Sequence, residues 1–280
     1  METAGLGHAT RARRRGKVLR DTGRALGGAL IFSMPMLMTM EMWWLGFTID
    51  PLRLVLLVIF CLPLLVLLSR RVGFEATRGW WEDVVDALFA LGISMVTSTV
   101  CLVAFGAIGP GMSAREIAGK IAIQVVPASI GALLARSQLG SDGPDEGKRQ
   151  ESYGGEMFLM AVGALFLGFN VAPTEEMIVI SHRMTPWHAA ALVVLSLMVM
   201  HGFIFAVGFR GGTELTPQTP WWSAFIRFTL PGYVIAMAMS LYVLWTFGRL
   251  DDAAFEQVIA TTIVLGFPSS AGAAAARLIL

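Results

Sequence analysis

The chain has 280 residues, of which 55% are hydrophobic and only 15% are charged, and its formal net charge is +1. Soluble domains carry about 25% charged residues, so the composition excludes an ordinary soluble globular protein and indicates a polytopic membrane protein. The lack of a large soluble domain also argues against a built-in ATPase motor. Cys61 and Cys101 both lie in apolar runs, where we expect buried thiols rather than a disulfide or a metal site.

Eight apolar stretches follow a basic N-terminal tail, and each is long enough to cross a bilayer as a helix. We expect the tail, residues 1–23, to be a disordered cytoplasmic segment. Two groups of four spans follow, residues 24–139 and 154–280, joined by a Gly- and Asp-rich cytoplasmic linker at 140–153. The predicted spans are about 24–47, 52–69, 82–106, 113–136, 157–181, 186–209, 221–247 and 254–279.

The distribution of cations predicts how the spans are oriented. Basic residues gather before the first span, after the second and after the fourth, which are Arg11, Arg13, Arg14, Arg15, Lys17, Arg20, Arg70, Arg71, Arg78, Lys148 and Arg149. With eight spans these segments all face one side, and cytoplasmic loops are the ones enriched in Lys and Arg. We therefore expect a multi-pass protein of the cell inner membrane with both termini in the cytoplasm.

A series of residues recurs in the same order in the two groups, which indicates an internal duplication. The matches are Gly28 with Gly163, Thr39 with Thr174, Glu41 with Glu176 and Pro51 with Pro186 at a shift of 135, and Trp80 with Trp221, Pro127 with Pro268 and Arg136 with Arg277 at a shift of about 141. Each group has an even number of spans, so both enter the membrane in the same direction. The predicted fold is an all-α transmembrane bundle of eight helices, built from two parallel four-helix repeats. Small residues after Pro127 and Pro268 place the fourth and eighth spans centrally, against the first and fifth.

Four stretches carry a resemblance to a known family: PMLMTMEMWW at 35–44, FNVAPTEEM at 169–177, TPWH at 185–188 and VLGFPSSAGAAAARL at 264–278. The chain resembles a family of uncharacterised bacterial integral membrane proteins, a domain of unknown function, over most of its length after the basic tail. The resemblance implies membrane insertion and brings no activity, cofactor or functional residue with it.

Two acids in apolar surroundings are the leading candidates for a site. Glu41 lies in the first span, several residues from its outer end, and Glu176 lies at the same level in the fifth span. A charged group inside a bilayer costs about 2.5–3.5 kcal/mol and usually faces a polar interior. Placed about a pseudo-twofold axis, the two carboxylates are expected to approach each other and to share a proton or bind a cation. Structural hydrogen bonding and simple exposure at the headgroups are the open alternatives.

Three further polar residues are expected to support this ion or proton site. Asn170 lies three residues before Pro173, and that proline frees a helix carbonyl of the kind that ligates cations in transporters. Lys120 lies about two turns inside the fourth span, where it is expected to neutralise Glu41 or Glu176. Gln124 lies one turn further in, on the same helix face.

Other charges are expected to be structural. Asp86 with Arg227, and Arg115 with Glu256, occupy matching positions in the two groups and have opposite signs. We expect these pairs to join the halves, with snorkelling to the nearest interface as the competing interpretation.

The sequence therefore predicts movement of a small cation or proton through a site between two repeats. A non-transporting scaffold or lipid-binding membrane protein is the alternative, and an intramembrane metal-dependent enzyme is the third interpretation. The spacing of the histidines fits no metalloprotease motif, and no phosphate loop or nucleophile elbow occurs in a suitable context. We therefore expect no enzyme activity, no resident metal and no cofactor. The expected partners are the lipid bilayer and a small cation or proton, with no nucleic acid.

Overall fold

The structure, a computed structural model, describes residues 2–72, 79–139, 152–206 and 221–279. All the regular elements in these ranges are helices: α1 (Glu2–Leu37), α2 (Met40–Thr48), α3 (Pro51–Val72), α4 (Trp80–Ala104), α5 (Ala114–Leu139), α6 (Tyr153–Val171), α7 (Glu175–Arg183), α8 (Pro186–Ala206), α9 (Trp221–Ala224), the π-helix η1 (Phe225–Thr229), α10 (Leu230–Thr246) and α11 (Phe255–Ile279). Seven helices are long and apolar enough to cross a membrane, or eight when the bent pair α1–α2 counts as one span. The prediction of an all-helical membrane protein is confirmed.

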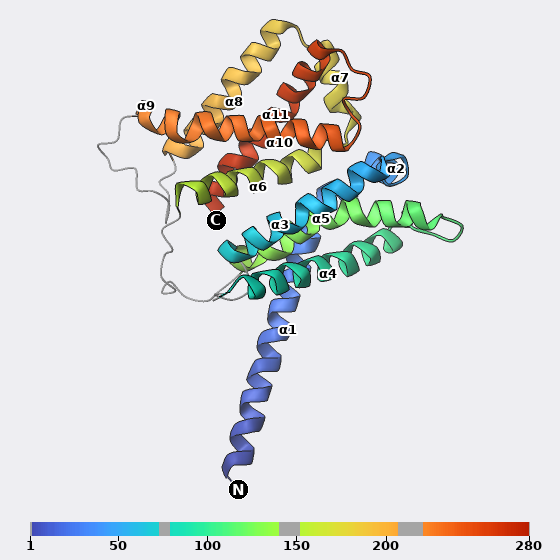
Figure 1. Cartoon of the computed structure of the whole chain (residues 1–280), viewed down its shortest axis with the longest axis vertical. Coiled ribbons are helices and arrows are strands. Elements are labelled where there is room, and N and C mark those ends of the chain that lie inside the picture. Colours follow the sequence, from blue (N-terminus) through green and yellow to red (C-terminus); the bar gives the residue numbers. More distant parts are fainter. Residues whose placement is uncertain (1, 73–78, 140–151, 207–220, 280) are drawn as a thin grey trace.

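The helices run back and forth between two ends of the molecule. In Figure 1, α2 and α7 lie on the right, whereas the C-terminus and the first residues of α4, α6 and α9 lie on the left. Helix α1 begins at Glu2, so the structure draws as helix most of the segment for which the composition predicts a disordered tail. The expected linker at 140–153 lies almost wholly outside the described residues, as do Arg78, Lys148 and Arg149.

The helices over the predicted first and fifth spans, 24–47 and 157–181, are interrupted. Helix α1 ends at Leu37, and α2 leaves it at an angle of 88°. Helix α6 ends at Val171, and Pro173, which has no N–H to continue a helix, precedes α7. Both breaks are held in the same way, because Thr39 donates its N–H and its hydroxyl to the Met36 carbonyl, and Thr174 donates both to the Val171 carbonyl. Glu41 and Glu176 therefore lie in the short helices that follow these breaks.

Helices α5 and α11 are central, as the sequence predicts. Helix α5 packs against α1 to α4, and α11 packs against α6, α7, α8 and α10. The closest crossings rely on glycine: a Cβ at Gly28 would lie 2.2 Å from the carbonyl oxygen of Gly131, and a Cβ at Gly163 would lie 2.2 Å from that of Gly272. Small residues thus let the backbones of the crossing helices touch, which is how helices associate in lipid.

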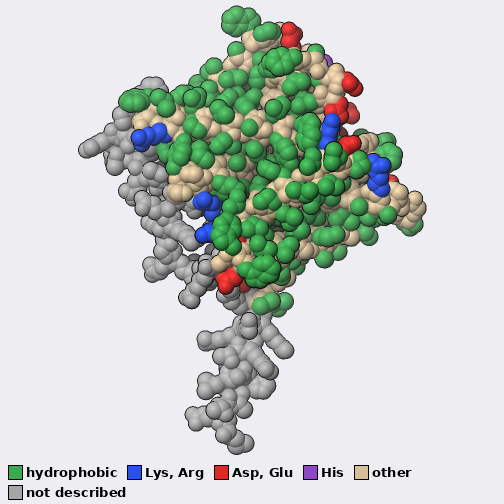
Figure 2. All heavy atoms as spheres, in the orientation of Figure 1, with side chains coloured by type: hydrophobic (Ala, Val, Ile, Leu, Met, Phe, Trp, Pro, Cys, Tyr) green, Lys and Arg blue, Asp and Glu red, His purple; other side chains and the backbone are tan. Residues whose placement is uncertain are grey.

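The two groups of helices meet along a narrow contact. It joins α6 to α1 and α5, and α10 to α3. Phe32 of α1 and Phe166 of α6 pack with ring centroids 4.8 Å apart. Figure 2 shows hydrophobic side chains over most of the visible face, with charged groups gathered toward its edges. A surface of this kind suits insertion in a bilayer, which leaves the polar groups at the contact between the two halves as the candidates for chemistry.

Candidate functional site

The two helix breaks bring acids of both halves together. Glu41 lies half-buried in the first turn of α2, and its Oε1 accepts a hydrogen bond from the backbone N–H of Glu175 at 3.4 Å. Glu175 opens α7, and Glu176 follows it, exposed, in the same turn. The structure therefore brings Glu41 to Glu175, the residue before the one that the sequence analysis selected.

A cation, Arg249, lies close enough to these acids to feel their charges. Arg249 follows α10, in a turn where Gly248 adopts a φ of +69°, and its Nη2 donates to the carbonyl of Pro173 in the break between α6 and α7. Burial lowers the pKa of Arg249 from its ordinary value, while the charges of Glu175 and Glu41 act in the opposite direction. Its Nε is buried and has no partner among the described residues. We call Glu41, Glu175 and Arg249 the junction cluster.

A second arginine, Arg53, makes an ion pair between the two groups of helices, beside the junction cluster. Arg53, near the start of α3, donates to both carboxylate oxygens of Asp251 at 2.9 and 2.8 Å. It also donates to the Trp245 carbonyl at 2.9 Å and lies over the Trp245 ring. The sequence analysis selected neither this arginine nor Arg249. One feature of the sequence could have indicated them: Arg53 and Arg249 are isolated cations at the end of the molecule that otherwise has few cations.

Two predicted supporting residues present buried oxygens without donors. Asn170 donates Nδ2–H to the Phe166 carbonyl at 2.8 Å, and Gln124 donates Nε2–H to the Ser33 carbonyl at 2.8 Å. A carbonyl can only accept, so each contact fixes which end of the amide is nitrogen. The oxygens Asn170 Oδ1 and Gln124 Oε1 are buried and have no hydrogen-bond partner in the part of the chain that the structure describes. Such oxygens are available to a cation, a water molecule or a proton carrier.

Lys120 has other partners than the predicted acids. Its ammonium binds Glu116 Oε1 at 2.9 Å and donates to the Ala107 carbonyl at 2.8 Å, while its side chain is almost fully buried. Glu116 is one turn away on α5, so the pair is local to the helix. In this structure Lys120 is therefore part of a separate polar group under α2.

The four residues expected to form structural charge pairs lie apart from the junction cluster. Arg115 and Glu256 are exposed near the starts of α5 and α11, Asp86 is half-buried in α4, and Arg227 is exposed in η1. Within the described ranges, Arg53 and Asp251 form an ion pair between the two groups of helices. Within these ranges, no three His, Cys, Asp or Glu side chains gather where they would hold a metal ion.

The fold and the junction cluster define a class, a polytopic helical membrane protein with charged groups where its two halves meet. Residues 21–280 match the model of a family described as "Putative integral membrane protein (DUF2391)", and the chain belongs to this family. The resemblance seen in the sequence is thereby confirmed. No curated protein and no solved structure matches the chain.

Proposed function

We propose that the protein moves a small cation or proton through a site between two parallel four-helix repeats. The observation that carries the proposal is the junction cluster, in which Glu41 of one half meets Glu175 and Arg249 of the other. Charges from distant parts of an apolar chain rarely meet without a functional reason. Broken helices that hold polar groups between repeats are the common construction of ion sites in secondary transporters.

Matching contacts in the two halves support the repeat. A Cβ at Gly28 meets Gly131 and Ala135 at 2.2 and 2.5 Å, and a Cβ at Gly163 meets Gly272 and Ala276 at the same distances. The turns that end α4 and α10 also match, with Gly106 at φ +70° and Gly248 at φ +69°. These glycines are 142 residues apart, whereas Trp80 and Trp221 are 141 apart. The π-helix η1 lies between Trp221 and Gly248, and a π-bulge accounts for one inserted residue.

The chemistry of the cluster favours a cation over an anion. Two carboxylates and two donor-free amide oxygens are acceptors, and hard cations are bound by oxygen ligands. Arg249 supplies the positive charge when no other cation is present, so an incoming cation or proton competes with it for Glu41 and Glu175. Asn170 lies three residues before Pro173, whose carbonyl binds Arg249, and its buried oxygen is a further acceptor on the same helix.

We further propose that both termini face the cytoplasm of a bacterial cell, in the inner membrane. The C-terminus and the ends of the helices that flank the basic connections lie at the end of the bundle opposite α2 and α7. The cations of the tail and of the connection after α3 belong to that end, and cytoplasmic segments carry the excess of Lys and Arg. The junction cluster then lies toward the outer face.

Flux through reconstituted protein tests the proposal. Liposomes containing the wild type, a Glu41→Gln, Glu175→Gln double variant or a Glu256→Gln control are placed under imposed cation and pH gradients. We expect flux from the wild type and the control, and loss of flux from the double variant at unchanged thermal stability. Absence of flux under every gradient, or full flux in the double variant, would contradict the proposal.

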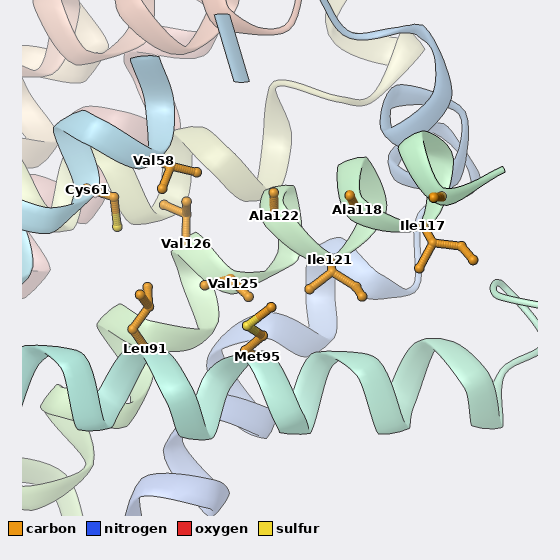
Figure 3. Close-up of a pocket in the computed structure, with 11 residues that line it drawn as sticks. Val58, Cys61, Leu91, Met95, Ile117, Ala118, Ile121, Ala122, Val125 and Val126 are labelled. Carbon is orange, nitrogen blue, oxygen red and sulfur yellow. The ribbon is translucent and has the colours of Figure 1, made fainter. Parts of the chain in front are cut away.

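The alternative of a lipid-binding scaffold is favoured by a different observation. An apolar groove of about 510 Å³ lies between α3, α4 and α5, and Figure 3 shows Val58, Met95 and Ile121 pointing into it. Its lining residues carry no charge, and the only heteroatoms in their side chains are the sulfurs of Cys61 and Met95. An acyl chain of the bilayer matches this lining. Tight lipid retention without flux would favour this alternative.

A further inference from the structure

A second polar site lies under α2, apart from the junction cluster. A pocket of about 300 Å³ is lined by Trp43, Trp44 and Phe47 of α2 and by Glu116 and Lys120 of α5. Trp44 and Phe47 are 62% and 60% exposed, whereas Lys120 is 4% exposed. The pocket thus has aromatic walls open to the surroundings and an ion pair at its base.

The ion pair between Glu116 and Lys120 is not required to hold α2 against α5. In the corresponding contact of the second half, α7 packs on α11 through Gln257, which donates to Ser181 Oγ at 2.7 Å, and Thr261, which donates to Ser181 Oγ at 3.1 Å. Gln257 and Thr261 lie 141 residues after Glu116 and Lys120. Neutral hydrogen bonds therefore suffice to hold a short helix against a long one. The charges in the first half come at an extra desolvation cost, which a structural role alone does not explain.

The aromatic walls also occur in one half only. At the shift of 135, the residues that correspond to Trp43, Trp44 and Phe47 are Ile178, Val179 and His182 respectively. An aromatic face attracts a cation through its quadrupole, and Trp does so best. The first half alone thus combines aromatic faces with a carboxylate.

The arrangement of Glu116 and Lys120 indicates the sign of the charge that a ligand in this pocket would carry. Glu116 uses Oε1 for Lys120, and its Oε2 has no further partner among the described residues. Both residues line the pocket, but the Lys120 side chain is only 5% exposed and already binds the Ala107 carbonyl, whereas the Glu116 side chain is 21% exposed, so the carboxylate is the more accessible charge. A metal ion needs several oxygen ligands, and this pocket offers one carboxylate between aromatic rings. An organic ammonium needs only these two elements.

We propose that this pocket binds an organic ammonium group, carried either by the ethanolamine headgroup of a zwitterionic lipid or by a free amine. The exposed Trp44 and Phe47 are the kind of residues that lie at the headgroup level of a bilayer. The ammonium lies between the aromatic faces and donates to Glu116 Oε2. The site is independent of ion movement at the junction cluster, whereas the comparison with the second half and the choice of the variant below rest on the proposed repeat.

Lipid binding to the delipidated full chain tests the site. Native mass spectrometry compares phosphatidylethanolamine with phosphatidylglycerol of identical acyl chains. The main variant, Glu116→Gln with Lys120→Thr, installs the residues of the second half and is expected to fold, since replacing a buried ion pair as a whole is commonly tolerated. Trp44→Leu removes an aromatic face, and Glu256→Gln is the control for a carboxylate outside the pocket.

We expect the wild type and the control to prefer the ethanolamine lipid, and both pocket variants to lose that preference by about tenfold. Tryptophan fluorescence with ethanolamine hydrochloride, against sodium chloride, identifies the source: a response that the variants lose points to a free amine, and binding of the lipid alone points to the headgroup. The proposal would be overturned by a wild type that prefers phosphatidylglycerol, or by folded variants whose preference is unchanged. It would also be overturned if the wild type retained both lipids equally and showed no response to the amine.

Discussion

The crossing of α6 and α11 makes a sharp prediction about stability. Gly163→Ala places a Cβ 2.2 Å from the Gly272 carbonyl oxygen and 2.5 Å from Ala276 Cβ. Ordinary van der Waals contact begins near 3.4 Å, so the two helices have to separate by roughly 1 Å. Overpacking of this kind costs about 1–3 kcal/mol, and losing the close Cα–H···O contacts costs about 0.5–1 kcal/mol each.

The helix propensity of alanine offsets about 1 kcal/mol of this cost. The net loss expected for Gly163→Ala is about 1–3 kcal/mol, which corresponds to a fall in Tm of about 2–10 °C. Thermal unfolding in detergent, followed by circular dichroism, measures it. Gly28→Ala is expected to lower the Tm by a similar amount, because its contacts with Gly131 and Ala135 have the same lengths.

Gly92→Ala is the matched control, since a Cβ on Gly92 of α4 meets nothing within 4 Å. It is expected to leave the Tm unchanged or raise it slightly, because only the helix propensity changes. A Gly163→Ala protein as stable as the Gly92→Ala protein would refute the close crossing. Unequal losses at Gly28 and Gly163 would remove the support that these contacts give to the repeat.

Two further predictions concern the arginines at the junction of the halves. The coupling between Arg53 and Asp251 is expected to be only about 0.2–1 kcal/mol, because the Asp251 side chain is 53% exposed and water screens the pair. A double-mutant cycle of Arg53→Ala with Asp251→Ala measures it, and a coupling above about 2 kcal/mol would contradict a screened pair. Arg249→Gln removes the cation that competes for Glu41 and Glu175 and is expected to raise cation flux severalfold. A flux assay on the proteoliposomes checks it, and an unchanged flux in folded protein would show that Arg249 does not compete with the transported cation.

Composition and periodicity predict much of the fold. The runs that became α3, α4, α5, α8, α10 and α11 are apolar over at least 18 residues, and such runs leave few alternatives to a membrane span. The breaks at Thr39 and Thr174 escape this reasoning. Thr39 lies between Met38 and Met40, so hydropathy stays high through the first break, and hydropathy alone does not place the second break between Pro173 and Glu175.

The same breaks explain why the site was only partly predicted. The match with Glu41 at a shift of 135 selected Glu176, whereas in the structure the backbone N–H of Glu175, the first residue of α7, donates to Glu41. Arg249 depends on the path of a loop after Gly248, which periodicity does not encode. The pairing of Lys120 with Glu116, four residues apart on one helix, was predictable from spacing.

The most direct test of a polar path between the halves is the reactivity of a thiol at Asn170. In a chain with Cys61→Ala and Cys101→Ala, Asn170→Cys is exposed to a small, water-borne cationic thiosulfonate in intact proteoliposomes. The account predicts labelling, slowed by the transported cation, while Met160→Cys, which is also buried but lies in the core of the second half, stays unlabelled. An Asn170→Cys thiol as inert as that control would contradict the path.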